Sequence, residues 1–173
     1  IVMEYVEGPD LKTILSLYAK KGIHIPPEYV LWILSEAAEG LHYAHKYKEK
    51  ITHEEIGIIH RDVSPQNLLI SRQGELKIID FGIAKIKTSE DKTQTGLIKG
   101  KINYLSPEQV EGIELDGRSD LFSLATVGWE LLTGKKLFNG PNEISIIRAI
   151  DQADNSVTAP STFNSVIPKQ LDF

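Results

Sequence analysis

The chain has 173 residues, of which 41% are hydrophobic and 25% are charged, the composition of an ordinary folded domain. Its net charge of −5 provides no global basic field, which argues against nucleic acid or an anionic membrane as a partner. The chain has no cysteine and no apolar run near the ~20 residues of a membrane helix, which excludes a disulfide scaffold, a thiolate metal site and membrane contact from this segment.

The first third of the chain predicts a strand end followed by two helices. Residues 1–6 indicate the end of a β-strand, and residues 170–173 carry no helix stop signal, so we expect both ends to be truncated. A short helix is predicted over 10–20, ended by Gly22. Pro26 and Pro27 open a longer predicted helix. Its apolar residues recur at helical spacing: Val30, Ile33, Leu34, Ala37, Leu41 and Ala44.

The rest of the chain predicts short strands, a long loop and two more helices. Residues 46–55 are charged and indicate a loop. Three strands are predicted, at 58–59, 68–70 and 76–79, the last two joined by a turn at 72–74. The polar segment 85–101 lacks periodicity and predicts a long loop. A buried helix over 120–132, ended by Gly134, and a helix over 143–153 complete a mainly helical α+β order.

The chemistry-bearing residues gather in the segment 60–67 and the triplet Asp80-Phe81-Gly82. Phosphoryl transfer requires a divalent metal on the phosphates and a carboxylate that orients the attacking hydroxyl. One carboxylate in a loop, an amide five residues later and a second carboxylate after a hairpin strand can supply these functions. Carboxylate and amide oxygens suit magnesium or manganese rather than zinc.

Three motifs in this order resemble the signature of protein kinases: His60-Arg61-Asp62 with Asn67, then Asp80-Phe81-Gly82, then Ser106-Pro107-Glu108. The resemblance implies that Asp62 accepts the proton of the substrate hydroxyl and that Asn67 and Asp80 hold the metal. The amino-acid sequences of segments 63–67 and 104–109 resemble those of bacterial (Hanks-type) serine/threonine kinases.

The resemblance covers nearly the whole chain and implies a partial kinase domain over 1–173. Residues 1–8 would be the end of the N-lobe strand and the hinge. Residues 9–173 would be a mainly helical C-lobe, truncated at its C-terminus, with a small β-hairpin cluster at the catalytic loop. The family's glycine-rich loop and strand lysine would precede Ile1, so this chain alone is expected to be inactive. The arginine that pairs with Glu108 would lie beyond Phe173.

The same resemblance implies an ATP site at the start of the chain. Met3 takes the gatekeeper position, and the backbone of Glu4 and Val6 would meet the adenine edge. Leu69 would form the floor beneath the adenine. Asp10 stands where the family contacts ribose, but an acidic residue at a helix start is also an ordinary N-cap.

Other matched positions are expected to support the site rather than to act in it. Asp120 would accept hydrogen bonds from the backbone of the catalytic loop, or would interact with the dipole of its own helix, and both can be true. Structural roles are likewise implied for four more residues: His60, Phe81, Gly82 and Glu108.

The chain departs from the family at two positions near the γ-phosphate. Ser64 replaces the usual lysine two residues after the catalytic aspartate, and Lys101 replaces the usual threonine after Gly100. We expect a reciprocal exchange in which Lys101 supplies the ammonium group and Ser64 the hydroxyl, since the reaction still needs cationic compensation. Alternatively, Lys101 is a solvated residue of the loop. Gln66 stands where many family members have a glutamate that attracts basic substrates, so the resemblance does not imply a preference for basic substrates in this chain.

Regulation by phosphate is implied by Arg61, because family members with this arginine are commonly switched by a phosphorylated loop. A phosphate carries about −1.5 to −2 charges and pairs well with guanidinium. Thr93 and Thr95 are the expected sites, and Thr88 and Ser89 are poorer candidates. Alternatively, these residues are polar loop positions without a role.

The sequence therefore predicts a cytoplasmic enzyme that uses ATP and magnesium (or manganese) to phosphorylate serine and threonine hydroxyls of protein substrates. A pseudokinase or interaction module with the same fold is one alternative. The joint presence of Asp62, Asn67 and Asp80 argues against it. A small-molecule phosphotransferase is another, and the Ser-Pro-Glu motif at 106–108 together with the long loop before it argues against that.

Overall fold

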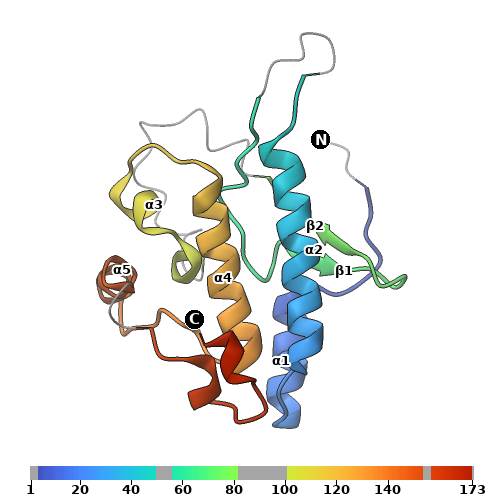
Figure 1. Ribbon diagram of the computed structural model, residues 1–173, viewed down its shortest axis with the longest axis vertical. Coiled ribbons are helices and arrows are strands. Elements are labelled where there is room, and N and C mark those ends of the chain that lie inside the picture. Colours follow the sequence, from blue (N-terminus) through green and yellow to red (C-terminus); the bar gives the residue numbers. More distant parts are fainter. Residues whose placement is uncertain (1–3, 50–55, 82–100, 154–156, 173) are drawn as a thin grey trace.

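The computed structural model describes residues 4–49, 56–81, 101–153 and 157–172. Two long helices, α2 and α4, lie side by side along the longest axis; a small hairpin lies beside α2, and α3 and α5 lie beyond α4 (Figure 1). The helices are α1 (Leu11–Lys21), α2 (Pro27–His45), α3 (Pro107–Glu111), α4 (Gly117–Thr133) and α5 (Glu143–Asp151). The remaining elements are β1 (Leu68–Ile70), β2 (Leu76–Ile78) and the 3-10 turns η2 (Ile102–Tyr104), η3 (Pro160–Thr162) and η4 (Lys169–Leu171).

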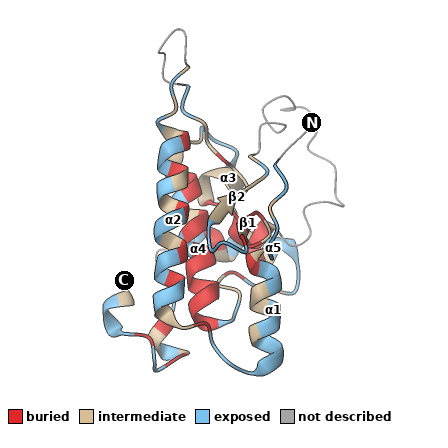
Figure 2. Ribbon diagram, turned by 90° about the vertical axis from the view of Figure 1, so that its right-hand side faces the viewer, coloured by how far each residue is buried: buried red, intermediate tan, exposed pale blue. Residues whose placement is uncertain are grey.

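The core of the molecule lies where α2 packs against α4. α2 buries one side and exposes the other, whereas α4 is buried over most of its length (Figure 2). The two helices approach closely at Gly128, where an added Cβ would lie 2.8 Å from the Leu34 side chain. The predicted apolar stripe of α2 is confirmed, since five of its six members are buried and Leu34 packs against the core: Val30, Ile33, Ala37, Leu41 and Ala44.

Helix ends follow local capping rules. The side chain of Asp10 accepts a hydrogen bond from the Thr13 N–H at 2.7 Å, and Gly22 ends α1 in the left-handed conformation with φ 66°. The helix predicted over 10–20 is therefore confirmed to within one residue. α4 starts three residues before the prediction because Asp116 caps it, and it ends at Gly134 as expected. α3 was not predicted, and a capping box between Ser106 and Gln109 explains it.

The hairpin that follows segment 60–67 is antiparallel. Leu68 pairs with Ile78 and Ile70 with Leu76, and the turn between them contains Gly74 at φ 83°. The strands predicted at 68–70 and 76–79 are thus confirmed, the second ending one residue earlier. β1 and β2 form the two-stranded sheet of the described residues.

One predicted strand is wrong. The strand end predicted at 1–6 stays a prediction, since residues 1–3 lie outside the described chain and residues 4–6 have no strand assignment there. The strand predicted at 58–59 is the wrong one, because the Ile58 N–H donates to the Ala44 carbonyl at the end of α2 instead of to a neighbouring strand. The loop prediction over 85–101 lies outside the described residues except for Lys101. Among the helices described, none has both the length and the apolar composition needed to cross a bilayer.

Candidate active site

The segment 60–67, which contains the residue predicted to be the catalytic base and is called the catalytic loop below, is fixed to α4 by one buried carboxylate. Asp120, which is 1% exposed, accepts a hydrogen bond from the His60 N–H at 2.8 Å through Oδ2 and one from the Arg61 N–H at 2.8 Å through Oδ1. The hydrogen bonds expected of Asp120 are therefore present. Each of its two oxygens therefore has a backbone amide donor inside the protein.

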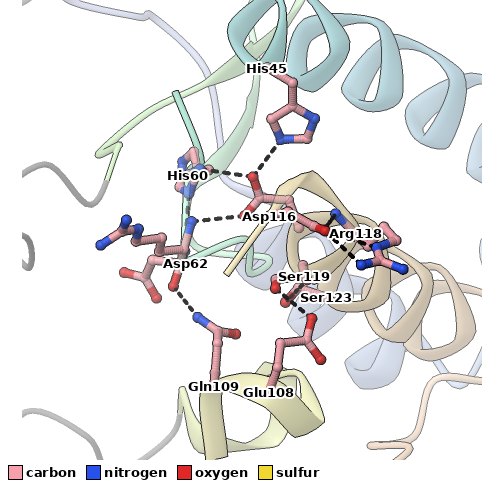
Figure 3. Close-up of polar contacts among 11 residues, drawn as sticks. His45, His60, Asp62, Glu108, Gln109, Asp116, Arg118, Ser119 and Ser123 are labelled. Atoms are coloured by element: carbon pink, nitrogen blue, oxygen red, sulfur yellow. Dashed lines mark hydrogen bonds and ion pairs between the residues drawn. The ribbon is translucent and has the colours of Figure 1, made fainter. Parts of the chain in front are cut away.

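His45, the last residue of α2, also contacts this carboxylate. Its Nε2 lies 2.7 Å from Asp120 Oδ2, the oxygen that also accepts from the His60 backbone N–H (Figure 3). Since the carboxylate can only accept, Nε2 of His45 carries the proton in this bond. Nothing in the local sequence pattern marked His45, because its partner lies 75 residues further along the chain.

Arg61 adopts a conformation that is unusual for a residue with a side chain. Its φ is 66°, in the left-handed region, which costs on the order of 1–2 kcal/mol for an L-residue. Its N–H is held by Asp120, and its carbonyl accepts a hydrogen bond from Gln109 Nε2 at 2.8 Å. The Nε of the Arg61 side chain is buried without a hydrogen-bond partner among the described residues.

His60 links the catalytic loop to the residue before Asp80. Its Nε2 donates to the Ile79 carbonyl at 2.9 Å, and its Nδ1 accepts from the Asp62 N–H at 3.2 Å. The ring also packs on Phe81, with 4.5 Å between ring centroids. One donor and one acceptor nitrogen are those of a neutral ring, and burial lowers the pKa of His60, although the hydrogen bond to Ile79 and the charges of Asp120 and Asp62 oppose the shift.

Asn67 is linked through its backbone to Ile79, the residue before Asp80. Asn67 Nδ2 donates to the Asp62 carbonyl at 2.7 Å, and the Asn67 carbonyl accepts from the Ile79 N–H at 2.9 Å. Ile79 is thus held at both backbone polar groups, by Asn67 and by His60. Asp80 follows it in the left-handed region at φ 57°. Backbone contacts therefore gather three of the predicted site residues: Asp62, Asn67 and Asp80.

The donor set of Asn67 and Asp80 fits a hard divalent cation. The Asn67 amide donates through its nitrogen, which leaves Oδ1 as the atom for a metal. The Asp80 carboxylate is exposed and makes no hydrogen bond or ion pair within the described residues. In the same part of the chain, no cluster of three or more His, Cys, Asp and Glu could hold a metal by itself. Magnesium suits such a site, because it keeps waters and phosphate oxygens as its other ligands.

Lys101 lies against Asp62. Its Nζ donates to Asp62 Oδ2 at 2.6 Å, and the two side chains are 34% and 14% exposed. Ser64 is 1% exposed, and its Oγ has no hydrogen-bond partner in the described chain. The structure thus places an ammonium group beside Asp62 and leaves a buried hydroxyl two residues after it.

The segment before α1 crosses β1 and its turn. The Ile70 N–H donates to the Pro9 carbonyl at 3.0 Å, the Arg72 N–H donates to the Glu7 carbonyl at 2.9 Å, and Asp10 forms a backbone bridge with Leu69. Gly8 is required at the crossing, because an added Cβ would lie 1.9 Å from the Ile70 oxygen.

Of the predicted nucleotide-site residues, Leu69 and Asp10 are adjacent in this crossing. The Asp10 carboxylate caps α1, which confirms the alternative that Asp10 is an ordinary N-cap. Glu4 is exposed and Val6 is half-buried. Met3 lies outside the described residues.

Glu108 holds α3 against α4. Its Oε1 accepts a hydrogen bond from Ser119 Oγ at 2.5 Å, and Ser119 is the residue before Asp120. Burial raises the pKa of Glu108, but the hydrogen bonds from Ser119, its own backbone and Ser106 outweigh it, so the pKa lies below its ordinary value. Besides Met3, the predicted residues that lie outside the described chain are Gly82, Thr93, Thr95 and the poorer candidates Thr88 and Ser89.

Comparison with known proteins identifies the family. The protein kinase domain model matches residues 1–172. Similar proteins include the tyrosine-protein kinase MasK of Myxococcus xanthus at 37% identity, the probable serine/threonine-protein kinase CPE1738 of Clostridium perfringens at 40%, and the serine/threonine-protein kinase PknB of Mycobacterium leprae at 40%. Each match covers 99% of this chain but only 26%, 23% and 25% of the respective relative, so the chain spans about a quarter of their length. The resemblance inferred from the motifs is confirmed, and the chain belongs to the protein kinase family.

Proposed function

We propose that the complete protein transfers the γ-phosphoryl group of ATP to serine and threonine hydroxyls of protein substrates. The observation that carries this proposal is the set of contacts around Asp62. The backbone before it is held by Asp120, its own N–H by His60, and its carbonyl by Asn67. A carboxylate fixed in this way can orient a hydroxyl, which is the task that phosphoryl transfer sets for the protein.

Each site residue then has a role. Asp62 accepts the proton of the attacking hydroxyl, and Asn67 Oδ1 and the Asp80 carboxylate would hold magnesium or manganese. A bound cation neutralises charge on the phosphates. The backbone of Glu4 and Val6 would bind the adenine edge, and the adenine site would include Leu69 and the gatekeeper Met3. The Asp10 oxygen that does not cap α1 contacts ribose. Support for this arrangement comes from the backbone contacts between segment 7–10 and β1.

The function is tested by incubating the complete protein with labelled ATP, magnesium and a mixture of unrelated proteins. We expect labelled phosphoserine and phosphothreonine, loss of the label when EDTA removes the metal, and recovery when magnesium is restored. A protein that binds ATP but transfers nothing would instead be a pseudokinase.

A second acceptor, tyrosine, is favoured by one specific observation: a relative that is 37% identical over 172 residues is named a tyrosine-protein kinase. Phosphoamino-acid analysis of the same reaction separates the two. Phosphotyrosine as the main product would replace the serine/threonine assignment without changing the roles of Asp62, Asn67 and Asp80. We propose the cytoplasm as the place of either reaction, because ATP is available there.

Lys101 is proposed to supply the cation that the family's catalytic-loop lysine provides. Its contact with Asp62 at 2.6 Å supports this role. Lys101→Met in the complete protein should lower kcat by about 10²-fold, in the range found when one group that stabilises developing charge is removed. Lys20→Met, at an exposed position of α1, is the matched control and should leave kcat unchanged. Steady-state assays decide, and near wild-type turnover of Lys101→Met would end the exchange hypothesis.

Phosphorylation of Thr93 or Thr95 is proposed as the switch of the site. The buried Arg61 Nε without a described partner supports it, because a phosphate oxygen could satisfy this donor. We expect mass spectrometry of the active protein to find phosphate on at least one of the two threonines. Full activity with both residues unmodified would contradict the proposal.

A further inference from the structure

Gln109, the third residue of α3, joins this helix to the backbone of the catalytic loop (Figure 3). We propose that Gln109 is a positioning residue for Asp62: its side chain fixes the Arg61–Asp62 peptide group and thereby couples the aim of the catalytic carboxylate to the placement of α3. The proposal rests on the proposed function, since it assigns Gln109 a part in the reaction of Asp62.

The oxygen and the nitrogen of the Gln109 side-chain amide both form hydrogen bonds, one within α3 and one to the catalytic loop. Oε1 accepts from the Ser106 N–H at 3.0 Å as part of the capping box, and Nε2 donates to the Arg61 carbonyl at 2.8 Å. An N–H needs an oxygen and a carbonyl needs a donor, so both contacts assign the same orientation to the amide. A side chain that only capped α3 would need its oxygen alone.

The carbonyl that Gln109 holds belongs to the peptide group that leads into Asp62. Arg61 is in the left-handed region, which persists only where neighbouring groups hold the backbone. Asp120 holds the Arg61 N–H from α4, and Gln109 holds the Arg61 carbonyl from α3. Without the second contact, the Arg61–Asp62 peptide plane can rotate, and the direction of the Asp62 side chain changes with it.

α3 and α4 are themselves linked, which closes a circuit of hydrogen bonds. Ser119, directly before Asp120, donates to Glu108, directly before Gln109. The path therefore runs from α4 through Asp120 to Arg61, through Gln109 to α3, and through Glu108 back to α4. Ser106, the N-cap of α3, follows the segment that carries Lys101. A displacement of that segment therefore moves α3, and Gln109 passes the movement on to the backbone of Asp62.

The decisive variant is Gln109→Glu in the complete protein, since it keeps the oxygen that caps α3 and removes the donor to Arg61. At pH 8 we expect kcat to fall roughly tenfold or more, because small displacements of a catalytic group carry large rate costs, while the KM for ATP stays within about twofold. As the pH is lowered toward 5.5, the ratio of variant to wild-type kcat should rise, because a protonated carboxyl again donates to the Arg61 carbonyl. Gln109→Met should be slow at every pH.

The matched control is Asn142→Ala, which breaks the capping box of α5 at an exposed position outside the site. It should lower the melting temperature like the Gln109 variants but leave kcat unchanged. Hydrogen–deuterium exchange provides a readout without turnover: residues 60–64 should exchange faster in Gln109→Glu than in wild type or Asn142→Ala. A Gln109→Glu variant with wild-type kcat and unchanged exchange would overturn the inference. If wild type transfers no phosphate, the proposed function fails, and the exchange data still decide the role of Gln109.

Discussion

Asp62→Asn in the complete protein should lower kcat for phosphoryl transfer by about 10²–10⁴-fold, the usual contribution of a positioned general base. Asparagine has the same shape, and its oxygen can still accept from Lys101, so the fold and the contacts of the loop backbone are retained. ATP binding should change little, because Asp62 acts on the acceptor hydroxyl. Single-turnover measurements with saturating ATP separate the chemical step from binding.

The control for this change is Asp151→Asn, at the exposed end of α5. It removes the same charge far from the catalytic loop and should leave kcat at the wild-type value. An Asp62→Asn variant within tenfold of wild type would show that another group receives the proton.

Asp120→Asn should lower both the stability of the protein and the rate of phosphoryl transfer. An amide has one oxygen in place of two, so either the His60 or the Arg61 N–H loses its acceptor and faces an NH₂ group. An unsatisfied buried donor costs about 1–3 kcal/mol of folding free energy, and the His45 contact also loses its charge. Because the catalytic loop is then held less firmly, we also expect kcat to fall by about 10²-fold.

Asp116→Asn is the matched control, because it makes the same substitution four residues earlier, at the exposed N-cap of the same helix. Asparagine caps helices as well as aspartate does, and the exposed pair with Arg118 contributes little, so stability should change by less than about 1 kcal/mol. Urea unfolding and steady-state kinetics of both variants measure the difference. Equal stability of the two variants would contradict the structural role of Asp120.

Local sequence signals predicted the elements whose ends are set locally. α1 has its cap at Asp10 and its stop at Gly22, and the hairpin has its turn at Gly74, so all three signals lie within or directly beside the elements they define. The strand predicted at 58–59 failed for the opposite reason. Two adjacent isoleucines favour a strand, but the Ile58 N–H meets a helix carbonyl fourteen residues earlier in the sequence, at Ala44.

The candidate site divides in the same way. The motifs around Asp62 and Asp80 could be read from the sequence because their members are contiguous or closely spaced. His45 and Gln109 could not be found, because their partners lie 75 and 48 residues away and no pattern in a single sequence reports such pairs. Ser64 and Lys101 were noticed only as departures from a resemblance, and the contact between Lys101 and Asp62 became visible with the structure.

The crossing at Gly8 has a consequence for the nucleotide side of the site. The course of residues 7–10 is set by main-chain bonds to β1 and its turn, and position 8 leaves no room for any side chain. Side chains at 4–7 can therefore vary without displacing the path of the chain, whereas even a methyl group at position 8 would lift the whole segment off the hairpin. Substitutions at residues 4–7 should thus be tolerated, whereas any substitution of Gly8 should not be.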